Sequence, residues 1–289
     1  MAGPKPTSAV LALVLTALCT LICAALLTAP ASAATTVSAN WAGYVAAPRA
    51  SARFSSVSGI WRQPAASCTL GRPSFAAVWV GLGGYGEGVA SLEQIGTDAN
   101  CSADGHADYA SWFELLPADP VAVKLRVSPG DLLAASVTMS GRHVTLRIRN
   151  LTTGARFSTT RHYAHPDGST AEWIVEAPSS CSGQGVCTTL PLADFATVPF
   201  SIATASVRGH TGGVQDPLWS TAAIELRQGS SDTTGPGASV NAHLAGNVVR
   251  ATPSAVSRSR SFAVSWSQSS GPGEPASAPS LPGFGGTRR

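Results

Sequence analysis

Residues 121–149 read VAVKLRVSPGDLLAASVTMSGRHVTLRIR, and this stretch decides the fold. Apolar residues occupy every second position in three segments, at 121–127, 133–139 and 144–148. Alternation with a period of two is typical of strands that have one buried and one solvated face. Turn-forming residues separate the segments, Ser-Pro-Gly-Asp at 128–131 and Ser-Gly at 140–141. The stretch therefore predicts three antiparallel strands joined by short turns.

Similar short apolar segments, bounded by turn residues, recur along most of the chain. No segment of ten or more residues has a convincing helical period. Many short antiparallel strands in one chain favour an all-β fold in which two antiparallel sheets pack as a sandwich. The further strands are expected at 41–47, 54–61, 75–82, 89–96, 107–116, 156–163, 170–176, 198–207, 219–227 and 261–267.

The composition excludes several classes of protein. Only 12% of the 289 residues are charged, against about 25% in an average soluble domain. The 29 glycines and 20 prolines exclude a helical bundle, whereas a hydrophobic content of 44% and seven tryptophans exclude a wholly disordered chain. A net charge of +3 without a basic run makes nucleic acid an unexpected partner.

The N-terminus has the layout of a secretory signal peptide. Lys5 precedes an apolar stretch at 10–27, and Ala31-Ser32-Ala33 forms a small-x-small cleavage pattern. We expect residues 1–33 to be removed, although the apolar stretch is long enough to span a bilayer as an uncleaved anchor. The mature chain is expected to be secreted, monomeric and without stable membrane association. A folded domain at 34–267 precedes a disordered Ser/Gly/Pro-rich tail at 268–289.

Four cysteines remain after cleavage, and an even number in an exported chain indicates disulfides. Three pairings are possible, of which Cys68–Cys101 and Cys181–Cys187 are favoured; the second would close a short glycine-containing loop. We expect no metal, because there is no Cys-x-x-Cys and the pair His162/His165 has no carboxylate at useful spacing.

Polar residues inside otherwise apolar strands mark the candidate site. Gln94 shares a strand face with Leu92, and Glu172 shares one with Ile174 and Glu176. A carboxyl group among large apolar side chains has a raised pKa unless it is partnered, which is typical of acid/base residues. A solvated glutamate on an outer face is the competing interpretation, and the pattern alone favours it.

Six stretches resemble, in order, the glutamic peptidases, also called eqolisins. They lie at 40–45 (NWAGYV), 79–84 (WVGLGG), 92–98 (LEQIGTD), 109–117 (YASWFELLP), 170–176 (TAEWIVE) and 192–195 (LADF), and the closing strand at 261–266 matches too. The resemblance implies a concanavalin A-like or jelly-roll sandwich and an endopeptidase with the catalytic pair Gln94 and Glu172. It further implies that the cleft is lined by Trp79, Asp98, Trp112 and Glu114. Two acidic cleft positions of the fungal members fall at Gly83 and Ala110, which bears on the acid optimum.

The residue types suit peptide hydrolysis by water without a cofactor. Ionised Glu172 would act as the general base and then as the acid for the leaving amine, while the Gln94 amide would stabilise the oxyanion. This chemistry predicts an acidic optimum whose lower side is set by the pKa of Glu172, with a polypeptide as substrate.

Two other functions remain open at the level of sequence. A glycoside hydrolase on a similar sandwich would use paired carboxylates, such as Glu172 with Glu176 or Glu93 with Glu114. A non-catalytic module that binds cell wall or sugar would keep the fold only and offer its tryptophans as ligand platforms.

Overall fold

A computed structural model describes residues 34–49, 51–86, 91–181, 187–228, 233–234 and 248–268. The secondary structure of these residues is entirely β, and none of them forms a helix that could span a membrane. The predicted signal peptide lies outside the described residues, as does the predicted tail apart from residue 268.

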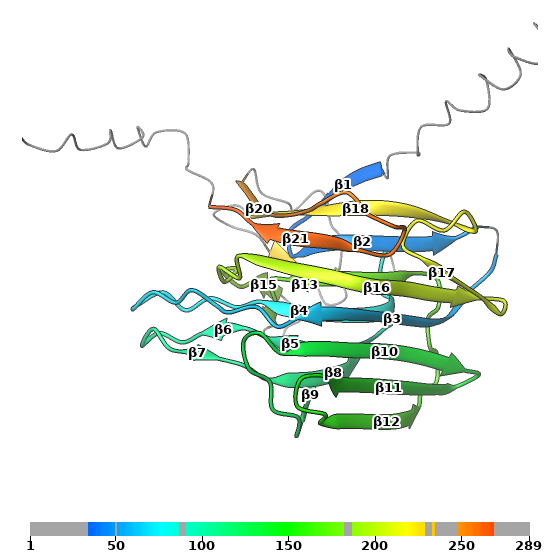
Figure 1. The fold of residues 1–289 in the computed structure, drawn as a ribbon, viewed down its shortest axis with the longest axis horizontal. Coiled ribbons are helices and arrows are strands. Elements are labelled where there is room, and N and C mark those ends of the chain that lie inside the picture. Colours follow the sequence, from blue (N-terminus) through cyan, green and yellow to red (C-terminus); the bar gives the residue numbers. More distant parts are fainter. Residues whose placement is uncertain are drawn as a thin grey trace, which may run out of the picture. The chain divides into compact units, whose positions relative to one another are not determined.

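The strands form two layers that pack face to face (Figure 1). β3 and β10 of one layer lie against β4 of the other, and β10 and β11 lie against β5. The first layer consists of β2 (Trp41–Pro48), β13 (Ala171–Glu176), β4 (Ala77–Gly83), β5 (Leu92–Asp98), β8 (Ser111–Leu115) and β9 (Val121–Val123). The second consists of β12 (Arg156–His162), β11 (His143–Asn150), β10 (Leu132–Ser140), β3 (Phe54–Arg62), β16 (Thr197–Val207) and β17 (His210–Gly213).

The predicted sandwich is confirmed, but its layers are not two separate sheets. Hydrogen bonding continues from β16 to β2 through a side formed by β21 (Phe262–Trp266), β20 (Val248–Pro253) and β18 (Trp219–Gln228). β1 (Ala34–Ser38) adds a parallel pairing to β18, an exception to the antiparallel pattern. Two small sheets complete the fold: β14 (Ser179–Cys181), β15 (Cys187–Thr189) and β19 (Thr233–Thr234), and β6 (Asn100–Cys101) with β7 (Ala107–Asp108).

The central strands of the two layers differ in how they are buried. Along most of their length, β10 alternates between buried and half-buried residues, and β11 alternates between buried residues and half-buried or exposed ones, as predicted for residues 133–139 and 144–148. In β4 every residue is buried, so both faces of the first layer are covered at its centre. On the inner face, the Trp173 indole donates to the Ser58 carbonyl of the second layer at 2.8 Å, and the Trp61 indole donates to the Thr97 hydroxyl at 3.1 Å.

The strand predicted at 121–127 is wrong in its second half. β9 ends at Val123, and the amide of Leu125 then donates to the carbonyl of Val123 at 2.9 Å, which closes a tight three-residue turn. The apolar alternation continues because Leu125 and Val127 are still buried beyond the turn. Burial of Leu125 and Val127 therefore produced the second half of the strand-like pattern.

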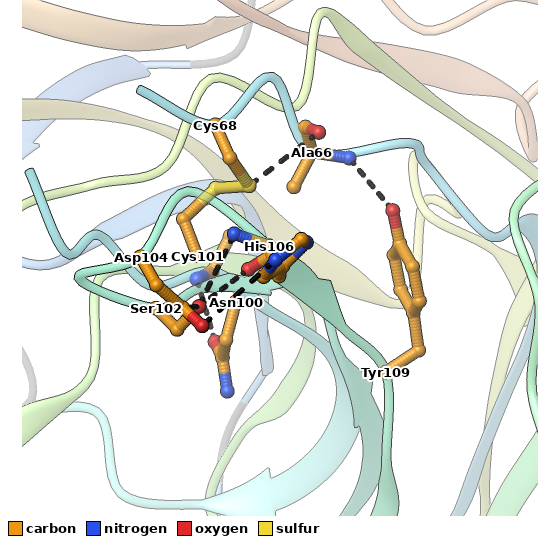
Figure 2. The surroundings of a disulfide bond; sticks show 9 residues. Ala66, Cys68, Asn100, Cys101, Ser102, Asp104, His106 and Tyr109 are labelled. Carbon is orange, nitrogen blue, oxygen red and sulfur yellow. Dashed lines mark hydrogen bonds and ion pairs between the residues drawn. A yellow bond between two sulfur atoms is a disulfide. The ribbon is translucent and has the colours of Figure 1, made fainter. Parts of the chain in front are cut away.

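A disulfide joins Cys68 to Cys101, one of the two favoured pairings (Figure 2). It ties the loop after β3 to β6, and the Tyr109 hydroxyl accepts the amide of Ala66 in the same loop at 3.1 Å. Cys187 is also disulfide-bonded and lies directly opposite Cys181 across β14 and β15. The side chain of Cys181 lies outside the described residues, so its pairing stays a prediction.

Candidate active site

Four residues line up across four neighbouring strands of the first layer. Glu172 on β13 lies opposite Gly81 on β4, Gly81 lies opposite Gln94 on β5, and Gln94 lies opposite Glu114 on β8. Directly opposite residues project from the same face of a sheet. Gly81 has no side chain, so β4 places none directly between Glu172 and Gln94, whose Cα atoms lie about 10 Å apart, two strand spacings. The ends of the Trp79 and Leu92 side chains cover the backbone of Gly81.

We call this side of the first layer the carboxyl face. Besides Glu172, Gln94 and Glu114 it presents Asp98, four residues beyond Gln94 on β5, and Glu176, four residues beyond Glu172 on β13. A cluster of apolar residues surrounds these groups and includes Trp41, Trp79, Leu92, Trp112 and Ile174. The carboxyl face is therefore a set of ionisable groups in a largely apolar setting.

Glu172 is fully buried, and neither of its carboxylate oxygens has a hydrogen-bond partner among the described residues. The amide oxygen of Gln94 is buried and unpaired in the same sense. Buried polar atoms are nearly always paired in folded proteins, and the exceptions concentrate at functional sites. Both residues that were predicted to be catalytic thus hold polar atoms that the fold itself leaves unused.

Burial strongly favours the protonated form of Glu172. Desolvation raises its pKa well above 4.5, and the nearby charges of Asp167 and Glu93 raise it further. The hydroxyl of Thr170, two residues before it, acts in the opposite direction, although it is not placed to hydrogen-bond with either carboxylate oxygen. Its raised pKa makes Glu172 a better proton acceptor than an ordinary glutamate, which suits a group that alternates between base and acid.

Glu114 orients the Gln94 amide. The Nε2 of Gln94 donates to Oε2 of Glu114 at 2.5 Å, which leaves the second N–H of the amide for another acceptor. Burial raises the pKa of Glu114 to about 7, against the opposing effect of this hydrogen bond. The contact holds Gln94 with its nitrogen on the Glu114 side.

Of the remaining predicted site residues, Glu114 belongs to this row, and Trp79, Asp98 and Trp112 lie beside the row on the same face of the layer. Trp79 is fully buried, and its indole donates to Glu176 at 2.8 Å while its ring meets Trp41 edge to face at 4.9 Å between centroids. Trp112 donates to Asp98 at 2.6 Å. Trp79 thus packs within the wall of the site, whereas Asp98 and Glu114 are only half-buried.

Burial also raises the pKa of the two carboxyl groups that these tryptophans contact. The pKa of Asp98 rises to about 6 and that of Glu176 to about 8, although each accepts an indole N–H that favours its charged form. Asn40 donates to the other oxygen of Glu176 at 3.1 Å. Glu176 is therefore neutral in acid and serves to hold Trp79 and Asn40.

Sequence reasoning missed two residues that shape the site. Gly81 leaves the gap between Glu172 and Gln94, and a Cβ there would lie 2.9 Å from Trp79 and 3.0 Å from Leu92. The sequence suggests only a glycosidase role for Glu93, as an acid/base partner of Glu114. In the structure Glu93 is fully buried, on the opposite face of β5 from Gln94. The Trp-Val-Gly motif was a signal for Gly81, and the polar residue at 93 in an apolar strand was a signal for Glu93.

The carboxylate pairs of a glycoside hydrolase do not form. Glu172 and Glu176 lie four residues apart on one strand, or about 13 Å, beyond the separation of about 5–9.5 Å that glycosidases use. Glu93 and Glu114 project from opposite faces, because Glu93 pairs with Leu115 and Gln94 pairs with Glu114.

The tryptophans are not exposed platforms for sugar either. Six of the seven are buried, and Trp266 is half-buried. A hollow of about 690 Å³ does lie on the second layer, lined by residues that include Ser136, Arg147 and Arg156. It lacks a carboxyl or amide side chain and so offers no acid/base pair.

Within the described ranges, no group of three or more His, Cys, Asp or Glu residues is placed to hold a metal ion. The expectation of a metal-free mechanism remains a prediction that rests on the chemistry of Glu172 and Gln94.

Residues 39–244 match the family described as the Peptidase A4 family, which covers most of the chain. The chain belongs to the Peptidase A4 family. This is the family of the eqolisins, so the predicted relationship is confirmed, and membership makes the protein a peptide-bond hydrolase. No curated protein sequence matches the chain.

Solved structures similar to this Peptidase A4 member share its fold. Scytalido-glutamic peptidase with a peptide-based transition-state analogue is 22% identical over 79% of this chain and 98% of the other, with a TM-score of 0.60. SCP-B, an eqolisin bound to the tripeptide Ala-Ile-His, is 21% identical over 79% and 98%, with a TM-score of 0.57. Aspergilloglutamic peptidase from Aspergillus niger is 25% identical over 67% and 99%, with a TM-score of 0.51.

Proposed function

We propose that this protein is a secreted endopeptidase that hydrolyses peptide bonds in weakly acidic solution, with Glu172 and Gln94 as its catalytic pair. The observation that carries the proposal is the in-register row of Glu172, Gly81 and Gln94, in which both functional side chains hold buried, unpaired polar atoms. A scissile carbonyl over Gly81 would have a base on one side and a hydrogen-bond donor on the other. Because both groups are buried, substrate binding requires neighbouring side chains to move.

The proposed reaction begins with water held between Glu172 and the peptide carbonyl. Ionised Glu172 takes a proton from the water as its oxygen attacks the carbonyl carbon. The carbonyl oxygen gains charge and accepts the N–H of Gln94 that Glu114 does not use. Glu172, now protonated, gives its proton to the departing nitrogen as the C–N bond breaks. Asp98 and Trp112, at the edge of the carboxyl face, are proposed to contact the substrate chain.

The pKa shifts sharpen the expected pH dependence. The base form of Glu172 is lost as the pH falls through its pKa, which lies well above 4.5, so the lower side of the profile should also lie above 4.5. As the pH rises past about 7, Glu114 ionises and adds negative charge beside the oxyanion position. The optimum is therefore expected in weak acid rather than strong acid.

Two observations support export, and two support a polypeptide substrate. The N-terminal 33 residues have the layout of a signal peptide, and the Cys68–Cys101 disulfide suits an oxidising compartment. The family to which the chain belongs is one of peptidases. Glutamic peptidases of this fold have been solved with a transition-state analogue and with a tripeptide. We propose that the mature protein acts as a monomer.

The test is cleavage of a denatured protein by the purified mature chain between pH 2 and 8, with fragments identified by mass spectrometry. Internal cleavage should occur and should persist with pepstatin, EDTA and reagents for serine or cysteine nucleophiles. Glu172→Gln should lose about 10²–10⁴ of the rate, the usual contribution of a general acid–base. Absence of cleavage by the wild type, or undiminished cleavage by Glu172→Gln, contradicts the proposal.

A further inference from the structure

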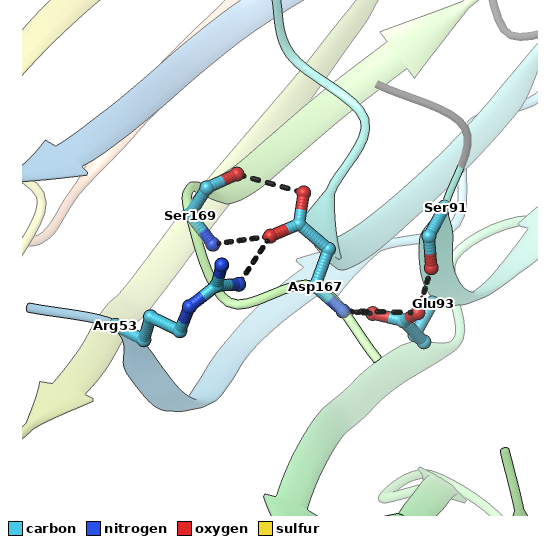
Figure 3. A network of polar contacts seen from close by, with 5 residues as sticks. All are labelled: Arg53, Ser91, Glu93, Asp167 and Ser169. Atoms are coloured by element: carbon cyan, nitrogen blue, oxygen red, sulfur yellow. Dashed lines mark hydrogen bonds and ion pairs between the residues drawn. The ribbon is translucent and has the colours of Figure 1, made fainter. Parts of the chain in front are cut away.

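Glu93 is a buried carboxylate that the proposed reaction does not use. It is 0% exposed and lies opposite Leu82 and Leu115 on the neighbouring strands. It lies between Ser91 and Asp167 in a short polar network that continues from Asp167 to Ser169 and Arg53 (Figure 3). The Ser91 hydroxyl donates to one oxygen, and the backbone amide of Asp167 donates to both, at 3.3 and 3.2 Å. Glu93 therefore binds the segment at 167–170, which leads into the strand of Glu172.

Asp167 closes the 167–170 segment on itself. Its carboxylate accepts the amide of Ser169 at 2.9 Å and the Ser169 hydroxyl at 2.8 Å. Arg53 at the start of β3 donates to the same carboxylate at 3.0 Å, although its side chain is largely exposed. The segment is thereby fixed by one buried contact to Glu93 and one surface ion pair.

The 167–170 segment is wedged among three strands. The Phe54 amide donates to the Gly168 carbonyl at 2.7 Å, and the Gly83 amide donates to the Thr170 carbonyl at 3.1 Å. A Cβ on Gly168 would lie 2.3 Å from the Phe54 carbonyl oxygen, and one on Gly83 would lie 2.7 Å from the Cβ of Asp167. There is no room for the segment to shift without disturbing β3 or β4.

The 167–170 segment determines both the position of Glu172 along the chain and part of its electrostatic environment. Thr170 ends it, β13 begins at Ala171, and Glu172 is the next residue. The Thr170 hydroxyl is the group that lowers the pKa of Glu172, and Asp167 and Glu93 are the two charges that raise it. A displacement at Asp167 therefore reaches Glu172 through the four residues between them.

We propose that Glu93 is a positioning residue for the catalytic pair: it holds the 167–170 segment, and through that segment it fixes the placement and charge environment of Glu172 without touching substrate. This inference rests on the proposed function of Glu172. Glu93 projects away from the carboxyl face, so it acts from behind the strand that carries Gln94.

The electrostatic part of this role has a definite sign. Burial raises the pKa of Glu93 to about 7, and the charge of Asp167 adds to the effect, while Ser91 and the Asp167 amide oppose it. Ser91 and Asp167 face Glu93, Leu82 and Leu115 are its apolar neighbours, and Arg53 lies beyond Asp167. Glu172 lies on the other face of the layer, where the charge of Glu93 still raises its pKa. Ionised Glu93 repels the charged form of Glu172, so removing the charge that Glu93 gains as the pH approaches 7 should lower the pKa of Glu172.

The test compares two substitutions in the full mature chain. Glu93→Gln keeps the shape of the side chain and removes the charge that Glu93 acquires near pH 7. The acid limb of kcat/KM should therefore move to lower pH by at most about half a unit, the effect of one full charge across roughly 10 Å. Glu93→Ala removes the contact to the segment, so kcat should fall about tenfold while KM stays within about twofold.

Asp131→Ala provides the matched control. Asp131 is a buried carboxylate that also ties a turn, through the amide of Ser128 at 2.9 Å and the side chain of Asn150 at 2.7 Å, but it lies at the start of β10 outside the carboxyl face. The Asp131→Ala substitution should lower Tm and leave kcat and the acid limb of the kcat/KM profile unchanged. The positioning role would be overturned if Glu93→Gln kept the acid limb of the wild-type kcat/KM profile and Glu93→Ala kept the wild-type kcat, even if Tm falls in both variants.

A carboxyl-carbon NMR titration of Glu172 provides a readout that does not depend on activity. If the wild type fails to cleave peptides but Glu93→Gln still lowers the pKa of Glu172, the proposed function fails and the link between Glu93 and Glu172 stands. If Glu93→Ala does not fold, Glu93→Gln and this titration decide the matter: an unchanged pKa of Glu172 would overturn the inference.

Discussion

At the scale of the residue, the site is defined by what its polar atoms do and do not contact. Glu176 is held by Trp79 and Asn40, and Asp98 is held by Trp112, so these carboxyl groups have structural partners. Glu172 has no hydrogen-bond partner among the described residues, and Gln94 is anchored on its nitrogen side only. This contrast singles out Glu172 and Gln94 among several buried polar groups in one apolar setting.

Glu114 should matter through the orientation of Gln94. In Glu114→Ala the amide of Gln94 loses the acceptor of its Nε2 and can rotate, so kcat/KM should fall about tenfold or more, toward the loss caused by removal of an oxyanion donor. Glu114→Gln keeps an acceptor oxygen at the same place and should retain more activity than the alanine variant. Steady-state kinetics on one peptide substrate measure both. Equal rates in the two variants would show that the hydrogen bond does not orient Gln94.

At the scale of the element, register brings the pair together. Gln94 and Glu172 are far apart in the chain and meet only because β5 and β13 pair with β4 at the same position, Gly81. A one-residue slip in either pairing would turn one side chain to the inner face. The order of β13, β4 and β5 is thus the feature of the fold that creates the site.

Gly81→Ala should therefore damage activity more than stability. The added methyl group would press on Trp79, Leu92 and Gln94, from 2.9 to 3.3 Å away, and would fill the position proposed for the scissile carbonyl. Gly59→Ala is the matched control, because its methyl group would meet Trp173 and Val80 at 3.1 Å on the inner face. Each variant should lose about 1–3 kcal/mol of stability from overpacking, and only Gly81→Ala should lose most of its kcat/KM. Equal kinetic losses in the two variants would argue against this role for Gly81.

The sequence allowed prediction of the strands with a clear period and of the faces within them. The alternation in 133–139 and 144–148 corresponds to β10 and β11, and the shared face of Glu172, Ile174 and Glu176 is present in β13. Register between distant strands depends on non-local pairing, so the gap at Gly81 and the contact between Glu93 and Asp167 could not be predicted. β20 was missed because it is short and ends in a proline, without a clear alternating pattern.

At the scale of the whole molecule, the chain has few charged residues, and several of its acidic residues are buried. Only 12% of the chain is charged, yet Glu93, Glu114, Glu172 and Glu176 are all placed where burial raises their pKa. A fold built on apolar burial with few surface charges suffers less self-repulsion in acid. Composition and site environment thus both favour a protein that tolerates acid.

Stability should increase on acidification from pH 8 to pH 5. The folded-state pKa of Glu93 is about 7 and that of Glu176 about 8, against ordinary values near 4.5, so the folded state binds more protons than the unfolded state across this window. Stability is then lost as pH rises through these values, and Glu93 alone accounts for on the order of 2 kcal/mol. Thermal unfolding at matched ionic strength should give a higher Tm at pH 5 than at pH 8. A Tm that falls steadily over the same range on acidification would contradict this.

The central claim is that Glu172 and Gln94 act as one unit on the peptide bond, and a double-mutant cycle tests it most directly. The measurement is kcat/KM for the wild type, Glu172→Gln, Gln94→Ala and the double variant on one peptide substrate at the optimal pH. Residues that act as a unit lose their contributions together, so the double variant should be little worse than the weaker single variant. Losses that multiply in the double variant, or a single variant as active as the wild type, would contradict the account.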